Sequence, residues 1–327
     1  MKTVLITGAM GYIGGHTARL FRSRGYHVIG VDWESTVPES AQFINEWIKD
    51  DFANMAPIAT DIADIDYIVH CAGSSLVGPS INDPYTYFNN NVSRTNYFLN
   101  QLGSKGWQGN IVFSSSAAVY GIPAICPIPE NSKLLPISPY GDSKQMCETV
   151  IRRHCEAKGF KAISLRYFNA AGCSSDSSLG HVKDDTHLIP RILTAYSHGT
   201  VFTMNGNDYA TADGTCVRDY LHVEDIAEAH YRAVSYLDTC DAGFYNAYNL
   251  GTGEGFSNLD ILNTAECVVG DRINYQFGSR RIGDPDALIA AVGHFNQLTG
   301  WHPTHSSIGN IIETAWKWHY QNYGADL

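Results

Sequence analysis

The sequence is poor in positive charge and contains no basic run. Its 22 lysine and arginine residues stand against 33 aspartate and glutamate residues, which gives a formal net charge of −11 at pH 7. Such a surface would repel a phosphate backbone unless the basic residues were gathered into a patch. We therefore expect no nucleic acid as a partner.

Long apolar runs are lacking too. No window approaches the roughly 18 consecutive apolar residues of a membrane-spanning helix, and the apolar run at residues 4–6 is too short for the core of a signal peptide. We therefore expect no membrane partner and a cytoplasmic location. Hydrophobic residues make up 44% of the chain, a proportion that is normal for globular proteins and argues against intrinsic disorder.

The eight cysteines include no Cys-x-x-Cys pair. Zinc sites and compact disulfide frameworks both depend on closely spaced cysteines, so the sequence indicates neither. We expect free thiols in a reducing compartment and no metal site.

Short apolar segments alternate with helix-like segments along most of the chain. The predicted strands cover residues 4–6, 28–31, 42–49, 67–71, 110–114, 162–166 and 248–250, and the predicted helices cover residues 12–24, 140–158, 188–197 and 224–237. This alternation predicts an α/β fold with a mostly parallel, doubly wound sheet. The 327 residues leave room for a second, smaller domain, and the pattern loosens after about residue 172.

A glycine-rich turn follows the first predicted strand. Gly8, Gly11 and Gly14 are spaced as G-x-x-G-x-x-G, in the context where backbone approaches a pyrophosphate at a helix N-terminus. Alone, this spacing also fits an ordinary glycine turn. Asp32, however, directly follows the second strand, where a carboxylate accepts hydrogen bonds from an adenosine ribose and repels a 2′-phosphate. Because the next two residues supply no arginine for that phosphate, the sequence predicts NAD rather than NADP.

A tyrosine and a lysine four residues apart supply a candidate general base. Tyr140 and Lys144 share one face of the predicted helix, and a nearby cation favours the phenolate that removes an alcohol proton. Ser114, Ser115 and Ser116 follow a strand at its carboxyl end, where α/β sheets bind ligands. We expect a serine hydroxyl and Tyr140 to face the same crevice; the alternative is a surface tyrosine with ordinary strand-end serines.

Further motifs continue along the chain. They are Asn89-Asn90-Asn91-Val92, Ser114-Ser115-Ser116-Ala117-Ala118-Val119-Tyr120-Gly121, Ser138-Pro139-Tyr140, Arg166-Tyr167-Phe168-Asn169, Thr186-His187-Leu188-Ile189-Pro190, Asp213-Gly214-Thr215-Cys216-Val217-Arg218-Asp219-Tyr220, Tyr248-Asn249-Leu250-Gly251 and Arg280-Arg281-Ile282-Gly283-Asp284-Pro285. Together with the glycine turn, they resemble the extended short-chain dehydrogenase/reductase family and, within it, the UDP-glucose 4-epimerases (UDP-galactose 4-epimerases). The resemblance spans the chain as far as residues 316–319.

The resemblance implies a Rossmann-type doubly wound parallel sheet with a smaller mixed α/β substrate domain. The NAD-binding domain would comprise residues 1–172 and approximately 220–252, and the nucleotide-sugar-binding domain approximately 173–219 and 253–327. The implied activity is epimerisation at C4 of a UDP-hexose through a transient 4-keto sugar. UDP-glucose and UDP-galactose would be the main pair and the N-acetylhexosamines a further pair.

The resemblance also implies roles for single residues. Tyr140 would take the proton of the sugar O4, Lys144 would lower the pKa of that tyrosine and hold the nicotinamide ribose, and Ser116 would hydrogen-bond the reacting hydroxyl. The implied cofactor contacts are Gly8, Gly11, Tyr12, Ile13, Gly14, Asp32, Asp51, Phe52, Cys71, Ala72, Gly73, Asn91, Ser114, Tyr140, Lys144 and Tyr167. The implied substrate contacts are Ser116, Asn169, His187, Leu188, Arg218, Arg281 and Asp284.

Size selection and assembly are implied as well. Leu288 would border the C2 substituent of the sugar, where a large aromatic residue excludes an N-acetyl group. A homodimer would pair the helices near residues 93–102 and 140–155, the second of which carries Met146, Val150 and Ile151.

Two departures from the family pattern and two alternative functions remain. Ser75 stands where relatives often carry lysine, and Met204-Asn205 stand where an aromatic residue often lies beside the uracil.

Another nucleotide-sugar epimerase, or a dehydratase or decarboxylase, is one alternative. Dehydratases that resemble this chain carry acidic residues where it has Ala117 and Ala118, and methyl groups transfer no protons. The other alternative, a non-catalytic NAD-binding regulatory protein, should have lost part of the Ser-Tyr-Lys set.

Overall fold

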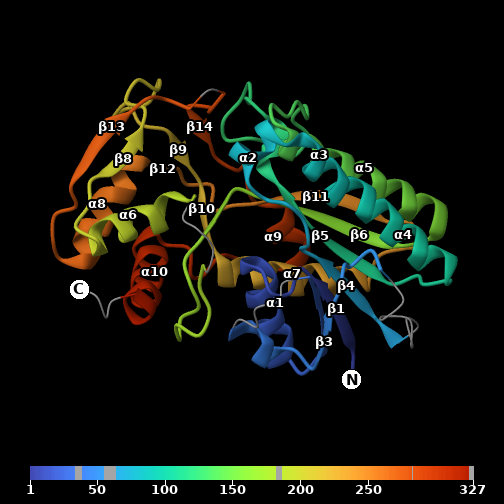
Figure 1. Ribbon diagram of the computed structural model, residues 1–327. Coiled ribbons are helices and arrows are strands. Elements are labelled where there is room, and N and C mark those ends of the chain that lie inside the picture. Colours follow the sequence, from blue (N-terminus) through green and yellow to red (C-terminus); the bar gives the residue numbers. More distant parts are fainter. Residues whose placement is uncertain (34–38, 55–63, 182–185, 282, 324–327) are drawn as a thin grey trace.

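A seven-stranded parallel sheet organises the molecule (Figure 1). The computed structural model describes residues 1–33, 39–54, 64–181, 186–281 and 283–323. The strands of this sheet are β1 (Thr3–Thr7), β2 (His27–Asp32), β3 (Glu46–Lys49), β4 (Tyr67–His70), β5 (Asn110–Ser116), β6 (Lys161–Tyr167) and β11 (Tyr245–Leu250). Their order is β11-β6-β5-β4-β1-β2-β3, so the winding reverses between β1 and β4. Ligands of doubly wound folds bind outside the carboxyl ends of the strands at such a reversal.

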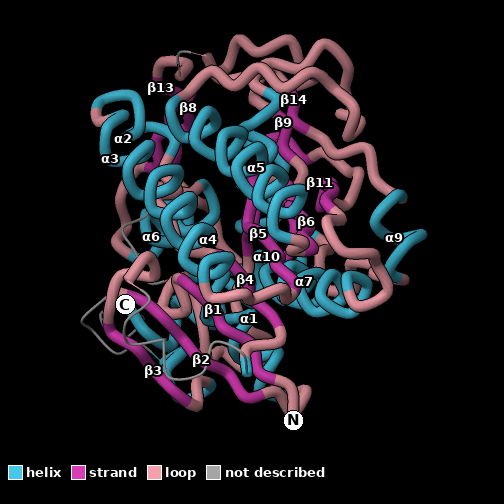
Figure 2. Tube along the Cα trace, turned by 90° about the vertical axis from the view of Figure 1, so that its right-hand side faces the viewer, coloured by secondary structure: helices cyan, strands magenta, loops and turns pink. Residues whose placement is uncertain are grey.

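Helices cover both faces of the sheet. One face carries α1 (Tyr12–Ser23) and α7 (Val223–Leu237), and the other carries α4 (Arg94–Ser104) and α5 (Pro139–Lys158) (Figure 1). Short helices, α2 (Val77–Asn82), α3 (Pro84–Tyr87) and the π-helical η3 (Phe88–Ser93), precede α4, and Figure 2 shows α2 to α5 grouped on one side of the sheet.

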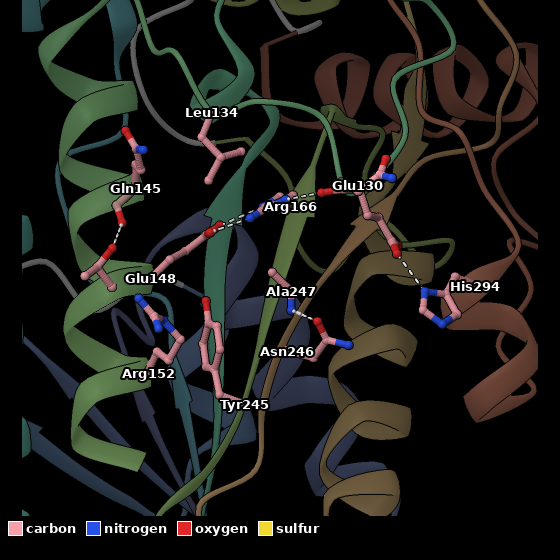
Figure 3. Close-up of a pocket in the computed structure, with 12 residues that line it drawn as sticks. Glu130, Leu134, Gln145, Glu148, Arg152, Arg166, Tyr245, Asn246, Ala247 and His294 are labelled. Atoms are coloured by element: carbon pink, nitrogen blue, oxygen red, sulfur yellow. Dashed lines mark hydrogen bonds and ion pairs between the residues drawn. The ribbon is translucent and has the colours of Figure 1, made fainter. Parts of the chain in front are cut away.

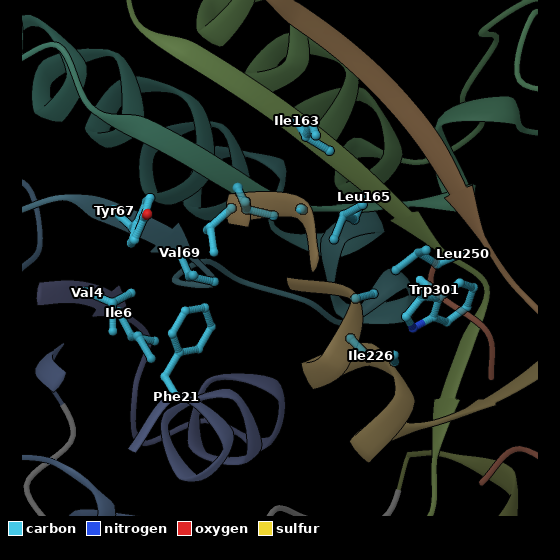
Figure 4. Close-up of a cluster of buried hydrophobic side chains, with 14 of the residues drawn as sticks. Val4, Ile6, Phe21, Tyr67, Val69, Ile163, Leu165, Ile226, Leu250 and Trp301 are labelled. Carbon is cyan, nitrogen blue, oxygen red and sulfur yellow. The ribbon is translucent and has the colours of Figure 1, made fainter. Parts of the chain in front are cut away.

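Alternation along the strands divides the core into two layers. Successive side chains of a strand point to opposite faces, so Val4 and Ile6 of β1 join the core under α1 and α7, whereas Leu5 joins the core under α4 and α5. In the first core, Phe21 of α1 and Ile226 of α7 lie on the same side of the sheet (Figure 4). The sheet is therefore held from both sides, and its carboxyl edge is left for a site.

The remaining elements form a smaller unit beside the sheet (Figure 1). Its helices are α6 (Leu188–Ser197), α8 (Asn258–Val269) and α10 (Ile308–Tyr323), which share a third core. Its short strands are β8 (Phe202–Asn205), β9 (Val217–Arg218), β12 (Phe256–Ser257), β13 (Tyr275–Gly278) and β14 (Ala287–Leu288). Two further short strands, β7 (Asn169–Ala171) and β10 (Tyr220–His222), pair with each other and contribute to both the first and the third core. Between β14 and α10, the segment that contains α9 (His294–Thr299) returns the chain to the first core through Phe295 of this helix and Trp301 after it.

The predicted α/β fold with a doubly wound parallel sheet is confirmed, and the predicted helix at residues 188–197 is found with these bounds. The predicted strand at residues 42–49 is wrong in its first half, because Glu39–Phe43 form the 3₁₀ helix η1 and β3 begins at Glu46. Asn45 explains the late start: its side-chain oxygen accepts from the backbone N–H of Val28 at 3.0 Å, in place of a regular strand partner.

Three global properties follow from the coordinates. All eight cysteines are free. Within the described ranges, no helix is long and apolar enough to cross a membrane. Among the same residues, no group of three or more His, Cys, Asp or Glu side chains is arranged to hold a metal ion.

Candidate active site

Backbone meets backbone at the carboxyl end of β1. Gly8 adopts a positive φ of 69°, and a Cβ placed there would lie 2.7 Å from the amide nitrogen of Ala72. A Cβ on Gly14, in the first turn of α1, would lie 2.1 Å from the carbonyl oxygen of Gly8. Both separations are too short for any side chain, so glycine is required at each position. Ile13, the residue before Gly14 in α1, packs against the first core.

This turn fits a dinucleotide pyrophosphate. Gly11 is the N-cap of α1 and makes no side-chain cap, and the first turn of the helix contains no acidic residue. The backbone N–H groups at the positive end of the helix are therefore left for an anion. The glycine pattern predicted from sequence thus forms a cradle of the required shape and polarity.

Asp32 lies at the end of β2 and is tied to the same turn. Its carboxylate accepts a hydrogen bond from the backbone N–H of Met10 at 3.0 Å. The next residue, Trp33, is exposed, and the guanidinium of Arg94 lies 5.1 Å from its ring centroid. Arg94 also forms an ion pair with Asp51. An arginine that the sequence analysis did not single out therefore contacts the residue after Asp32 and the predicted Asp51.

The side chains of Asp51 and Phe52 lie in different surroundings. Besides pairing with Arg94, Asp51 accepts from the backbone N–H of Ala53 at 3.0 Å and stays partly exposed. The ring of Phe52 is buried between those of His70 and Phe98, with centroid distances of 4.9 and 5.7 Å. Of these two predicted cofactor contacts, the aspartate is thus at the surface, and the phenylalanine side chain supports the core.

Asn91 joins the loop after β4 to α5. Its buried carboxamide accepts from the backbone N–H of Ser74 at 2.7 Å and donates to the carbonyl of the same residue and to the hydroxyl of Ser143. Gly73 has a φ of 150°, and a Cβ on it would lie 2.8 Å from the Asn91 side-chain oxygen. Ser143 in turn donates to the backbone carbonyl of Tyr140 at 2.7 Å. The predicted residues Gly73 and Asn91 therefore hold the beginning of the helix that carries Tyr140.

The first turn of α5 approaches the end of β5 closely. The side chain of Ser138 caps the helix by accepting from the backbone N–H of Gly141. A Cβ on Gly141 would lie 2.6 Å from the carbonyl oxygen of Ala118, two residues beyond Ser116. The glycine next to Tyr140 thus lets the helix contact the segment after the strand, and the predicted Ser116 and Tyr140 belong to two backbones in contact.

Lys144 is a buried cation. The residue is 5% exposed, and its ammonium donates to the backbone carbonyl of Ser114 at 2.7 Å and lies 5.9 Å from the ring centroid of Tyr140. In the described part of the chain, no carboxylate lies within ion-pair distance of it. Because a buried charge without a counter-charge is costly, this arrangement favours an anion nearby.

Beneath Lys144, polar side chains from three strands and a helix meet. The hydroxyl of Tyr167 donates to Ser114 Oγ at 2.7 Å, Ser114 Oγ donates to Cys71 Sγ, and His230 Nε2 of α7 lies 2.7 Å from the Tyr167 hydroxyl. Burial raises the pKa of Cys71 to about 11, lowers the pKa of His230 to about 4 and raises the pKa of Tyr167 well above its ordinary value. All three are neutral at pH 7. The sequence analysis predicted Cys71, Ser114 and Tyr167 but missed His230.

A second set of predicted residues lies in the smaller unit. Arg218 of β9 forms an ion pair with Asp284, which also accepts from the hydroxyl of Tyr209 at 3.0 Å. The guanidinium of Arg280 lies 3.9 Å from the ring centroid of Tyr209. Tyr209 and Arg280 are therefore part of this cluster, although the sequence analysis did not assign them to it.

The predicted Arg281 is exposed and lies next to Asn205. In the amide orientation that satisfies both groups, the Asn205 oxygen accepts from Arg281 Nε at 2.9 Å. Leu288 is the register partner of Arg218 in the pairing of β14 with β9, so the proposed size gate and the arginine are neighbours.

Other predicted substrate contacts share a cavity of about 250 Å³ lined by β7, β10, α6 and α10. Its lining includes Tyr12, Asn169, His187 and Leu188. Tyr12 donates its hydroxyl to the carbonyl of Gly172, which fixes the tyrosine at the mouth of the glycine turn. The cavity thus links the cofactor side of the crevice to the smaller unit.

The family is established by sequence comparison. A model described as the NAD dependent epimerase/dehydratase family matches residues 4–251. The chain belongs to this family. NAD, the cofactor predicted from Asp32, is thereby confirmed.

Relatives of this family member resemble it over nearly their whole length. A UDP-glucose 4-epimerase from Lactobacillus helveticus is 42% identical over 97% of this chain and 96% of its own. The crystal structure of a UDP-glucose 4-epimerase from Brucella ovis in complex with NAD matches with a TM-score of 0.91 and 37% identity, over 97% of this chain and 98% of that one. A UDP-Glc/GlcNAc 4-epimerase from Campylobacter jejuni matches with a TM-score of 0.83 and 33% identity, over 98% and 100% of the two chains.

We predict that Asp32→Ala weakens NAD binding by about tenfold or more and narrows the preference for NAD over NADP, since it removes a ribose acceptor and a repulsive charge. Asp32→Asn is the control, because it keeps an acceptor and removes only the charge. Calorimetry on protein stripped of cofactor measures both affinities, and tighter binding of NADP than of NAD by the unmodified chain would contradict the role of Asp32.

Proposed function

We propose that the chain catalyses NAD-dependent epimerisation at C4 of UDP-hexoses. The carrying observation is the buried ammonium of Lys144, which has no carboxylate within ion-pair distance among the described residues and lies near the Tyr140 ring, at the end of the strand that presents Ser116. The identity of 42% over nearly the full chain to a UDP-glucose 4-epimerase supports this chemistry over the other reactions of the family.

In the proposed mechanism, Tyr140 removes the proton of the sugar O4, and the Lys144 ammonium stabilises the phenolate that accepts it. The Ser116 hydroxyl hydrogen-bonds the reacting oxygen; its own oxygen is oriented by the backbone N–H of Ala118 at 3.2 Å. NAD⁺ held over the glycine turn supplies reversible hydride exchange with C4, through a 4-keto sugar. The neutral groups around Ser114 add no competing charge to the reacting centre.

The UDP end of the substrate is assigned to the smaller unit. Arg218 offers a guanidinium fork that suits a diphosphate, and Asp284 holds it in place. Arg281 adds a second guanidinium near Asn205. Asn169, His187 and Leu188 would contact the nucleotide through the cavity that they line. The proposed domain division follows the sequence boundaries: residues 1–172 and about 220–252 bind NAD, and the remainder binds the nucleotide sugar.

Two alternative functions are disfavoured. Ala117 and Ala118, buried or half-buried after Ser116, offer no acid or base for dehydration. A regulatory protein without turnover would not need a buried ammonium at Lys144. Incubation with a panel of UDP-sugars, without added NAD, tests the proposal: C4 epimers should form, and their absence with every sugar would reject it.

We predict that Tyr140→Phe lowers kcat by about 10²–10⁴-fold, because it deletes the proton acceptor. NAD content and thermal stability should stay unchanged, since the ring and its contact with Tyr87 are retained. Tyr320→Phe, which alters an exposed tyrosine of α10, is the matched control and should keep full activity. More than half of the normal kcat in Tyr140→Phe would remove this tyrosine from the mechanism.

Substrate size is proposed to be limited at Leu288. This side chain is half-buried and packs against the cluster of Ala117, Val119, Tyr120 and Ile128, so it lies between Arg218 and the residue after Ser116. Leucine lacks the ring that would fill the space beside C2, which is why we propose the N-acetylhexosamine pair as a further substrate.

We predict that Leu288→Tyr selectively abolishes turnover of UDP-N-acetylhexosamines and largely keeps that of UDP-glucose and UDP-galactose. A ring added at this position would occupy the space of the N-acetyl group. Leu298→Tyr on α9, at a more exposed leucine, serves as the control. Equal loss of both activities would mean that Leu288 serves folding, and no N-acetylhexosamine turnover in the unmodified protein would reject the dual specificity.

A homodimer is proposed through the side that carries α2 to α5. Exposed apolar side chains gather there: Val77, Ile81, Tyr85, Tyr97 and Met146. Ile151, expected to join the partner helix, is instead fully buried in the chain's own core, because it points toward the sheet.

Such an apolar surface is commonly covered in an oligomer. We predict sedimentation as a species of twice the 36.0 kDa chain mass at micromolar concentration, and Met146→Glu should shift it toward the monomer because the charge would have to be desolvated. A single 36.0 kDa species of the unmodified chain would reject the dimer.

A further inference from the structure

Buried polar contacts lie directly behind Tyr140 and Lys144. Glu148 follows Lys144 by one turn of α5, and its side chain is 6% exposed. Its carboxylate accepts from Arg166 Nε at 2.9 Å and from Arg166 Nη2 at 2.6 Å (Figure 3). It also accepts from the hydroxyl of Ser115 at 2.6 Å. Both partners precede residues of the candidate site: Ser115 is followed by Ser116, and Arg166 is followed by Tyr167.

The contacts continue across the sheet. Arg166 Nη1 donates to the hydroxyl of Tyr120 at 2.9 Å and to the carbonyl of Glu130 at 3.2 Å. The Tyr120 hydroxyl donates to the side-chain oxygen of Asn249 on β11 at 2.7 Å. One carboxylate on α5 is therefore connected to β5, to β6 and, through Arg166, to β11.

Stability alone gives a weak reason for this pair. Two buried charges lose their hydration, and the attraction between them often only offsets that loss, so apolar residues of similar size would stabilise the fold equally well. The pair has a property that apolar packing lacks, because a bidentate contact between guanidinium and carboxylate fixes both distance and direction. The neighbouring core contacts of α5, through Cys147, Ile151 and Cys155, carry no such directionality.

We propose that Glu148 and Arg166 are positioning residues that set the rotation and height of α5 on the sheet. Tyr140, Lys144 and Glu148 are spaced by four residues, so a small rotation or slide of the helix moves all three together. Holding Glu148 against Ser115 and Arg166 therefore holds Tyr140 toward Ser116. This inference rests on the proposed function, since it concerns the groups that would react.

The surroundings of Glu148 and Arg166 allow one of them to be substituted without unfolding the chain. The pair borders a cavity of about 760 Å³ lined also by Gln145, Thr149 and Arg152 of α5 (Figure 3). Water from that cavity is able to solvate a group left without its partner, so an isosteric change should not unfold the chain. Glu148→Gln keeps the shape of the side chain and removes its charge.

The first measurement compares Glu148→Gln with Glu156→Gln. Glu156 lies two turns further along α5 and pairs with Arg152 and Arg153 at the surface, so it is the matched control. We expect Glu148→Gln to lower kcat by about tenfold or more, with KM and NAD content close to normal, because misplacement of a reacting group acts on the chemical step. Glu156→Gln should behave as the unmodified protein.

Arg166→Lys is the second variant, because it keeps the charge and loses the fork. It should lower kcat in the same way, and Glu148→Asp should recover less than half of normal kcat because its shorter side chain does not reach both partners. If Glu148→Gln lowers NAD content or folded fraction in step with activity, or leaves kcat unchanged, the positioning role is wrong.

A double-mutant cycle with Tyr140→Phe completes the test. If Glu148 acts through Tyr140, adding Glu148→Gln to the Tyr140→Phe variant costs nothing further, whereas independent effects would multiply. Multiplied losses would therefore overturn the proposal. Failure of the proposed function is distinguishable, because it would appear as absent epimerisation in the unmodified chain or as an active Tyr140→Phe variant.

Discussion

The approach of backbone to backbone at the end of β1 is the constraint on which the site depends. The positions of Gly8 and Gly14 leave no space for a Cβ, so the backbones of β1, α1 and the loop after β4 contact one another directly at these two glycines. That contact sets the N-terminus of α1 over the crevice. Ser74, in the same loop, donates its backbone N–H to the side chain of Asn91. Asn91 in turn donates to Ser143 of α5, whose hydroxyl donates to the backbone carbonyl of Tyr140. The glycine turn and Tyr140 are thus placed by one continuous set of short contacts.

Burial also determines which groups of the crevice carry charge. Cys71, Tyr167 and His230 are kept neutral by their surroundings, whereas Lys144, equally enclosed, has a carbonyl and an aromatic ring as its nearest neighbours. The Lys144 ammonium therefore lies among neutral polar groups, 5.9 Å from the ring centroid of Tyr140.

Sequence predicted what depends on local spacing. The glycine turn, Asp32 and the pair of Tyr140 and Lys144 are each read from a short stretch, and the alternation of apolar segments predicts the sheet. Arg94 and His230 were missed because their contacts join residues far apart in the chain and no local pattern marks them. The late start of β3 was likewise missed. It depends on the side chain of Asn45, which replaces a strand hydrogen bond, and hydrophobic periodicity does not detect such a replacement.

In the proposed function, the boundary between the two units would link size selection to the reaction. Leu288 is held by the small sheet, as the register partner of Arg218, and its side chain packs against the cluster of Ala117, Val119, Tyr120 and Ile128 that follows β5. A change at Leu288 would therefore alter the space between the two units before it altered the side chains at the end of β5. Glu148 of α5 and Arg166 of β6 meet between the helix and the sheet, so the positioning role that we propose for them acts on the helix rather than on the space beside Leu288.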